Sequence, residues 1–305
     1  MAQNQDPPSD DPSTASGPGS GPGSSPGSSP GDPKSTPHGW RARWHEFLLA
    51  LTILTRLPLP AEHPGRDGVA EAAWAFAPVG AAIGLLSGLV FVAAGSLGLG
   101  VNVGLILAIT AQLLLTGALH ERGLAATADA VMLGETALSR LSLFKEMRPG
   151  VAGILALLIA LGLRHGSLSE LAGELIAVGD EFEATASYGV AVTISFILAG
   201  AASRVVMAWV WNALPAARAE DAEFDGHVTL RAALIGTAIV AALGAVLLSW
   251  KLFVVIAIGL GLLTLAAIGL LRGYFGGQAA QPLGAVQQCA EIFVLLCLSV
   301  MAVPV

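Results

Sequence analysis

Charge and cysteine are both scarce in this sequence. Charged residues make up 12% of the 305 residues, and the formal net charge is −7. Binding to nucleic acid normally requires a basic face, so this balance argues against a nucleic-acid partner. The two cysteines, Cys289 and Cys297, are too few for a disulfide framework and do not have a zinc-binding spacing. We expect both to be packing residues.

Apolar residues dominate the composition. They account for 54% of the chain, and the mean hydropathy is +0.71. Several runs reach the ~20 residues that a helix needs to cross a bilayer core, and they do not alternate as strands of a barrel would. The sequence therefore predicts an all-α, polytopic integral membrane bundle of about six to seven transmembrane helices. The expected spans are Ala75–Leu99, Val101–Leu119, Val151–Leu163, Tyr188–Trp211, Ala232–Ser249, Leu252–Leu271 and Ile292–Val305.

The first 38 residues have a different composition. The stretch "STASGPGSGPGSSPGSSPGDPKSTP" is almost entirely Gly, Ser and Pro and offers little apolar surface to bury. We expect residues 1–38 to form a disordered tail and residues 39–305 to form the transmembrane domain.

The distribution of Lys and Arg predicts the orientation of the expected spans. Short cytoplasmic connections hold an excess of these residues. By this rule three polar connections, 120–150, 212–231 and 272–291, face the cytoplasm, whereas the acidic connection 164–187 lies outside. A site built where the three connections meet would be open to water-soluble substrates.

Some polar residues stand out within this pattern. Arg204 lies inside an apolar run, where an ionisable group is a functional candidate unless it reaches the interface. The glycines of "GYFGGQAAQPLG" allow close backbone approach to a ligand, although a flexible turn between spans explains them equally well. Lys145 and Arg148 are explained by the excess of basic residues in cytoplasmic loops, with no need for a bound ligand, but this rule does not explain Glu146.

Five stretches stand out in order along the chain after the tail. They are "FLLALTILTRLPLP" (47–60), "FAPVGAAIGLLSG" (76–88), "TGALHERGLAATADA" (116–130), "LFKEMRPGVAG" (143–153) and "GGQAAQPLGAVQQCAE" (276–291). Together they resemble the motifs of one family, the adenosylcobinamide-GDP ribazoletransferases, also called cobalamin synthases. The resemblance implies a transferase of vitamin B12 assembly in a bacterial inner membrane, with its active-site loops on the cytoplasmic side. Such an enzyme joins adenosylcobinamide-GDP to α-ribazole, or to its 5′-phosphate, and releases GMP with the help of Mg²⁺.

The sequence departs from the family pattern at several acidic positions. If residues 120–130 are helical, positions 122, 126 and 129 share one face. The family has Asp at all three, whereas this chain has Arg122, Ala126 and Asp129. The family Asp at 146 is Glu146 here, and two further acids are replaced by Gln281 and Gln288.

The resemblance also implies roles for the residues that remain. Asp129, Glu121 and Glu146 would share one Mg²⁺, although Glu121 lies about 100° from the 122/126/129 face and is equally well explained as solvated. His120 would orient or deprotonate the attacking hydroxyl, or serve as an interfacial histidine that hydrogen-bonds to backbone. Glu291 would close the site or favour the start of the final helix. The expected substrate-binding residues are Arg122, Lys145, Arg148, Gly276, Gly277 and Gln278.

Three functions remain open at this stage. The first is an active, divergent synthase in which Arg122 holds the substrate phosphates in place of a cation. The second is a paralogue that keeps the fold and corrinoid binding but has lost catalysis. The third is a small-molecule transporter, which fits less well because the polar residues gather at one face rather than in mid-span.

Overall fold

The apolar runs form helices in the computed structural model, which describes residues 39–58, 66–145, 148–178, 181–217 and 227–300. The expected tail, residues 1–38, lies outside these ranges. The elements are α1 (Trp40–Leu54), α2 (Arg66–Glu71), the 3₁₀ helix η1 (Ala72–Ala75), α3 (Phe76–Ser96), α4 (Val101–Thr116), α5 (Leu119–Leu133), α6 (Ala137–Leu143), α7 (Val151–Val178), α8 (Glu181–Ala213), α9 (Leu230–Leu247), α10 (Trp250–Phe275) and α11 (Ala280–Val300).

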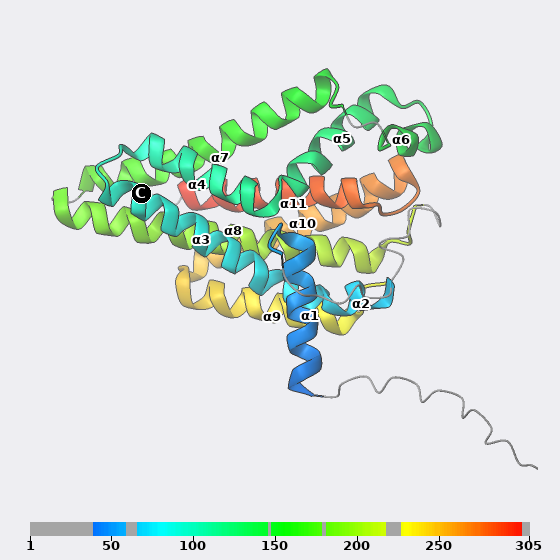
Figure 1. The fold of residues 1–305 in the computed structure, drawn as a ribbon, viewed down its shortest axis with the longest axis horizontal. Coiled ribbons are helices and arrows are strands. Elements are labelled where there is room, and N and C mark those ends of the chain that lie inside the picture. Colours follow the sequence, from blue (N-terminus) through cyan, green and yellow to red (C-terminus); the bar gives the residue numbers. More distant parts are fainter. Residues whose placement is uncertain (1–38, 59–65, 146–147, 179–180, 218–226, 301–305) are drawn as a thin grey trace, which may run out of the picture. The chain divides into compact units, whose positions relative to one another are not determined.

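The number of membrane-spanning helices agrees with the prediction. Within the described residues, six helices are long and apolar enough to cross a membrane, and the bent pair α4 and α5 raises the number to seven if it forms one span. The chain is thus a polytopic helical membrane protein. In Figure 1 the long helix α8 runs through the bundle and packs against α3, α7 and α11, and α1 crosses its direction.

The limits of three expected spans were wrong. The run Val151–Leu163 continues as α7 to Val178, so Arg164 lies within a helix and not in an external connection. The final span begins at Ala280, twelve residues before the expected start. The helix that begins at Val101 ends at Thr116, and after a break the chain continues as α5. For α7 and α11 the cause is shared: Arg164 and Glu291, which had marked the ends of spans, are buried and paired inside the bundle. α4 ends instead because the chain turns at Gly117 and Ala118, which both have positive φ.

The packing of α3 against α8 forms the centre of the bundle. Gly80, Gly84 and Gly88 lie along one face of α3, where an added Cβ would collide with the backbone of α8. Small residues at four-residue spacing allow membrane helices to approach this closely. α8 and α11 are the most buried of these spans. In an 18-residue apolar segment of each, 72% is buried, whereas the corresponding values for α9 and α10 are 22% and 17%.

Large apolar side chains cover much of the outer surface. Leu114 of α4, Val246 of α9 and Leu265 of α10 are 73%, 83% and 67% exposed. Exposed apolar surface on this scale fits contact with lipid and not with water.

The three connections expected to meet do meet at one end of the bundle. Arg140 in α6 donates a hydrogen bond to the carbonyl oxygen of Tyr274 at the end of α10 (3.2 Å). Ala217, which follows α8, donates its backbone N–H to the carbonyl oxygen of Gln278 (2.8 Å). Parts of the expected connections are nevertheless helical, because α5 covers residues 119–133 and α11 begins at Ala280.

Candidate functional site

The polar stretch after α4 forms a helix of its own. α4 and α5 meet at a bend of 86°, and the two residues of the break, Gly117 and Ala118, both have positive φ (61° and 52°). Because α5 is a regular helix, positions 122, 126 and 129 lie on one face as predicted. That face borders a cleft.

The cleft has a volume of about 450 Å³ and lies where α5, the end of α6, the start of α7 and the start of α11 meet. Its polar lining residues are Arg122, Asp129, Arg148 and Gln281, and the remainder of the lining is largely apolar. The structure thus brings together three of the expected site residues, which come from two separate motifs. Arg122 and Arg148 are exposed, whereas Asp129 is 8% exposed.

Asp129 is tied to the N-terminus of α7. Its two carboxylate oxygens accept hydrogen bonds from the backbone N–H groups of Gly150 (2.7 Å) and Gly153 (2.8 Å). The first N–H groups of a helix have no partner within the helix and favour a negative charge. A Cβ at Gly153 would lie 2.5 Å from Asp129 Oδ2, which explains why a glycine fits there.

The charge balance of the cleft favours an anionic ligand. Two guanidinium groups, those of Arg122 and Arg148, flank the single carboxylate of Asp129 among the described lining residues. Guanidinium groups bind phosphate oxygens in a bidentate fashion. The N-terminus of α7 adds further positive potential on the same side.

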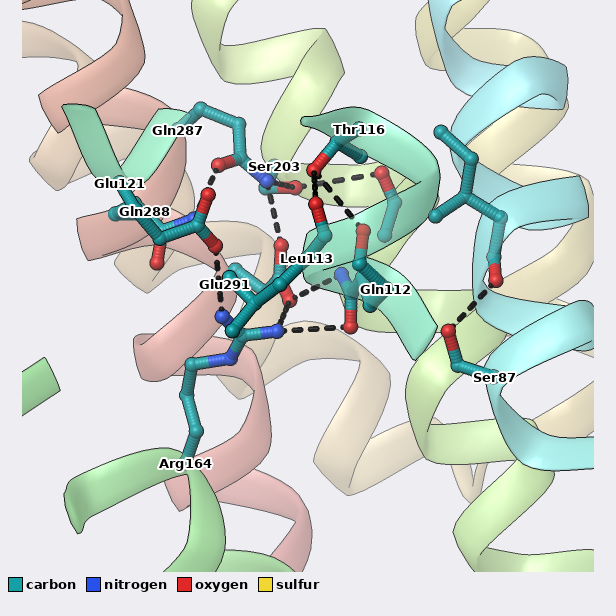
Figure 2. A network of polar contacts seen from close by, with 12 residues as sticks. Ser87, Gln112, Leu113, Thr116, Glu121, Arg164, Ser203, Gln287, Gln288 and Glu291 are labelled. Atoms are coloured by element: carbon teal, nitrogen blue, oxygen red, sulfur yellow. Dashed lines mark hydrogen bonds and ion pairs between the residues drawn. The ribbon is translucent and has the colours of Figure 1, made fainter. Parts of the chain in front are cut away.

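Glu121 lies elsewhere, in a buried polar network shown in Figure 2. Its Oε1 accepts hydrogen bonds from Arg164 of α7 (3.0 Å) and from Gln288 of α11 (3.0 Å). Arg164 also contacts Gln112 of α4 (2.8 Å) and Glu291 of α11 (3.0 Å). Glu291 therefore pairs inside the membrane, and it neither closes the cleft nor lies at the start of α11.

His120 and Arg204 lie near this network. His120 is 3% exposed, is absent from the lining of the cleft, and its Nε2 has no hydrogen-bond partner in the described part of the chain. Arg204 is fully buried, and its Nη1 donates to the carbonyl oxygen of Gly200 in its own helix (2.7 Å). Its side chain is enclosed by the bundle and does not extend to the surface, so the snorkelling explanation does not apply.

The remaining expected site residues do not line the cleft, or lie outside the residues that the structure describes. Gly276 ends α10 with a φ of 78°, and Gly277 packs against the backbone of Pro215. Gln278 is buried and pairs through its backbone with residues 215 and 217, so this glycine turn joins two connections. Lys145 is exposed after α6, and Glu146 lies outside the described residues. The roles in ligand binding that the sequence predicted for these five residues remain predictions.

The expected three-carboxylate metal site can be compared with this geometry. Glu121 and Asp129 are eight residues apart on α5, about 12 Å along its axis, and each carboxylate is bonded to different partners. The described residues contain no group of three or more His, Cys, Asp or Glu that is arranged to hold a metal ion. They do not fit a resident ion shared by Glu121 and Asp129. Asp129 alone faces the cleft.

Sequence reasoning missed most of the buried network. Gln112 carried no signal, because a single amide in an apolar run is compatible with an ordinary span. Gln287, which donates hydrogen bonds to Ser203 of α8 and to Glu291, was overlooked beside Gln288. Arg164 was interpreted as the first residue of an external connection. The expected span before it, Val151–Leu163, was too short to cross a bilayer, and this was a usable signal that the helix continues past Arg164. The cysteines are free thiols, and Cys289 is exposed, so a packing role does not hold for it.

Fold and cleft together define a class: a polytopic helical membrane protein with a cleft lined by two arginines and one aspartate at one end of its bundle. The chain belongs to the cobalamin-5-phosphate synthase family, whose model matches residues 46–299. This agrees with the resemblance noted in the sequence.

The chain is similar along most of its length to proteins named adenosylcobinamide-GDP ribazoletransferase. The relative from Mesorhizobium japonicum is 35% identical over 254 residues, which cover 83% of this chain and 92% of the relative. The relative from Bradyrhizobium diazoefficiens is 34% identical, with 81% and 90% covered, and that from Azorhizobium caulinodans is 35% identical, with 84% and 95% covered. No solved structure is significantly similar to this chain.

Proposed function

We propose that this protein is a working adenosylcobinamide-GDP ribazoletransferase of cobalamin biosynthesis and that the cleft between α5, α7 and α11 is its reaction site. A hydroxyl of α-ribazole, or of its 5′-phosphate, attacks the phosphorus next to the cobinamide. A new P–O bond forms, the bond to the bridging oxygen of the diphosphate breaks, GMP leaves, and the hydroxyl proton passes to the GMP phosphate or to water. The observation that supports this is the cleft itself, in which Arg122 and Arg148 lie beside Asp129.

Arg122 and Arg148 hold the diphosphate in this proposal. Phosphoryl transfer depends mainly on positioning and on neutralising charge on the phosphate oxygens, and two guanidinium groups serve both purposes. Arg122 occupies a position where the family motif has an aspartate. A positively charged side chain therefore takes the place of a carboxylate that would bind a metal cation. This exchange does not require loss of activity.

We further propose that Mg²⁺ enters with the diphosphate of the substrate. Mg²⁺ commonly binds through one or two protein carboxylates together with substrate phosphates. Asp129 is the described carboxylate that faces the cleft. When bound, the ion would neutralise part of the charge on the diphosphate.

The cleft is proposed to open to the bacterial cytoplasm. Arg122, Arg140, Lys145 and Arg148 lie on the connections at the cleft end of the bundle, which is the distribution expected of a cytoplasmic face. Both substrates would then reach the site from the cell interior, and the bundle would remain in the inner membrane.

Substrate preference tests the proposed role of the arginines. Purified protein in detergent should bind adenosylcobinamide-GDP at least tenfold more tightly than adenosylcobinamide, because charge-assisted hydrogen bonds to the diphosphate contribute about 1.5–3 kcal/mol each. The double variant Arg122→Gln with Arg148→Gln should lose most of this preference. Equal affinity of the wild type for both compounds would contradict the assignment of the cleft.

A further inference from the structure

The buried network around Arg164 takes no part in the proposed binding of the diphosphate, yet it connects four helices, α4, α5, α7 and α11. Its side chains come from α4 (Gln112), α5 (Glu121), α7 (Arg164) and α11 (Gln288, Glu291), and Figure 2 shows them converging around the guanidinium group of Arg164. This guanidinium lies at the centre of the cluster.

Arg164 bonds to both arms of the bent pair. Its Nη1 donates to Glu121 on α5 (3.0 Å), and its Nη2 donates to Gln112 on α4 (2.8 Å). The same Nη2 lies 3.0 Å from Glu291 Oε1, and Gln112 donates to that same oxygen (2.8 Å). One fully buried side chain thus links the helices on either side of the bend to α7 and α11.

The bend itself needs such support. Ala118 is the one non-glycine residue with positive φ in the described part of the chain, and it follows Gly117, which also has positive φ. A non-glycine residue in this conformation is strained and persists only where its surroundings hold it in place. The described polar contacts of Gln112 and Glu121 with Arg164 lie on the two sides of this break.

The position of α5 decides where the cleft residues lie. Arg122 follows Glu121 directly, and Asp129 lies two helical turns further along. α5 is therefore joined to α7 at two places: Asp129 bonds to the start of α7, and Glu121 bonds to Arg164 near its middle. Arg122 lies between these two attachments along α5, and Asp129 is itself one of them.

We propose that Arg164 is a positioning residue for the transfer reaction: it holds the α4–α5 bend through Gln112 and Glu121 and so fixes Arg122 and Asp129 at the cleft. This inference rests on the proposed function for its kinetic consequence, but its geometric consequence can be measured alone. Small displacements of groups that orient a reacting substrate lower rates by up to about 100-fold.

Arg164→Lys is the first test variant. Lysine keeps the positive charge between the two carboxylates, but its single ammonium group cannot reproduce the fork that joins Glu121, Gln112 and Glu291. We expect kcat for GMP release to fall at least tenfold. Gln112→Met is the second variant, because it cuts the contact with α4 without leaving a buried charge unpaired, and a several-fold fall is expected.

The matched control is Arg204→Lys. Arg204 is as deeply buried as Arg164, and lysine keeps its positive charge near the network, but its hydrogen bond to Gly200 stays within α8 and does not involve the bend. Its kcat should remain within about twofold of the wild type. A general sensitivity of the interior to Arg→Lys exchange would instead lower the activity of both variants alike.

Spin labels report the bend directly. With Cys289 and Cys297 replaced, labels introduced at Leu114 of α4 and Met132 of α5, both 73% exposed, give the distance between the arms. In Arg164→Lys and Gln112→Met this distance distribution should broaden or shift, and in Arg204→Lys it should not. Wild-type kcat in both test variants, or a lowered kcat with an unchanged distribution, would overturn the proposal. If the wild type releases no GMP, the proposed function fails, while the distance measurement still decides the role of Arg164.

Discussion

Replacing Asp129 by Asn separates two contributions of one carboxylate. The carboxylate accepts two hydrogen bonds from the start of α7, at 2.7 and 2.8 Å. An amide offers one oxygen and presents an NH₂ group to the second N–H, so one of these bonds is lost and the other loses its charge. Hydrogen bonds to charged acceptors contribute about 1.5–3 kcal/mol, so the free energy of unfolding should fall by about 2 kcal/mol.

Asp129→Asn should lower activity by more than its loss of stability explains. Asp129→Asn removes the negative charge from the described lining of the cleft and loosens the segment that carries Arg148. We expect kcat/KM for GMP release to decrease at least tenfold per folded molecule. Thermal unfolding in detergent and GMP release, measured on the same preparation, give the two quantities.

Thr136→Ala is the matched control for the loss of a helix cap. Thr136 caps α6 by accepting a hydrogen bond from the backbone N–H of Ser139 (3.2 Å), and its loss should cost about 1 kcal/mol. Because Thr136 is not part of the cleft lining, activity per folded molecule should be unchanged. An Asp129→Asn protein with wild-type stability would show that the bonds to α7 contribute little, and equal activity losses in both variants would refute a special role for Asp129.

Three further predictions concern the cleft, the membrane orientation and the packing. Arg122→Asp with Ala126→Asp should lower the initial rate of GMP release by roughly 10- to 100-fold at all Mg²⁺ concentrations, because the change removes a phosphate contact and adds repulsion; a higher rate would show that Arg122 is not a phosphate clamp. In a cysteine-free background, Glu135→Cys and Arg272→Cys should react with an impermeant thiol reagent from the cytoplasmic side, and Leu97→Cys should react from the other side. Labelling of the first two from opposite sides would refute the prediction that their connections share one face of the membrane. Gly84→Val should destabilise the bundle by about 1–3 kcal/mol or more, because its side chain would meet the backbone of Phe196 in α8, and thermal unfolding equal to that of the wild type would contradict the close α3–α8 packing.

The sequence predicted the class of fold and one half of the cleft. Apolar runs of membrane length define the spans, and the helical period alone placed Arg122 and Asp129 on the same face, as the structure confirms. Both inferences depend on local order along the chain. Neither requires knowledge of which helices become neighbours.

Tertiary pairing explains what the sequence did not predict. Hydropathy treats Arg164 and Glu291 as separate charges that end a span, whereas in the fold they are 3.0 Å apart and partly compensate each other. The limits of α7 and α11 were therefore misplaced for the same reason. Asp129 was expected to bind metal, and its contact with α7 depended on a helix that begins twenty-two residues later.

Turnover by the purified protein tests the central claim most directly. The wild-type chain in detergent or liposomes, supplied with adenosylcobinamide-GDP, α-ribazole and Mg²⁺, should release GMP and form the phosphodiester product in equal amounts. Arg122→Gln with Arg148→Gln, at equal membrane insertion, should release GMP at least tenfold more slowly. Intact substrate after prolonged incubation with folded wild-type protein would contradict the account, and tight corrinoid binding without turnover would indicate instead a family member that has lost catalysis.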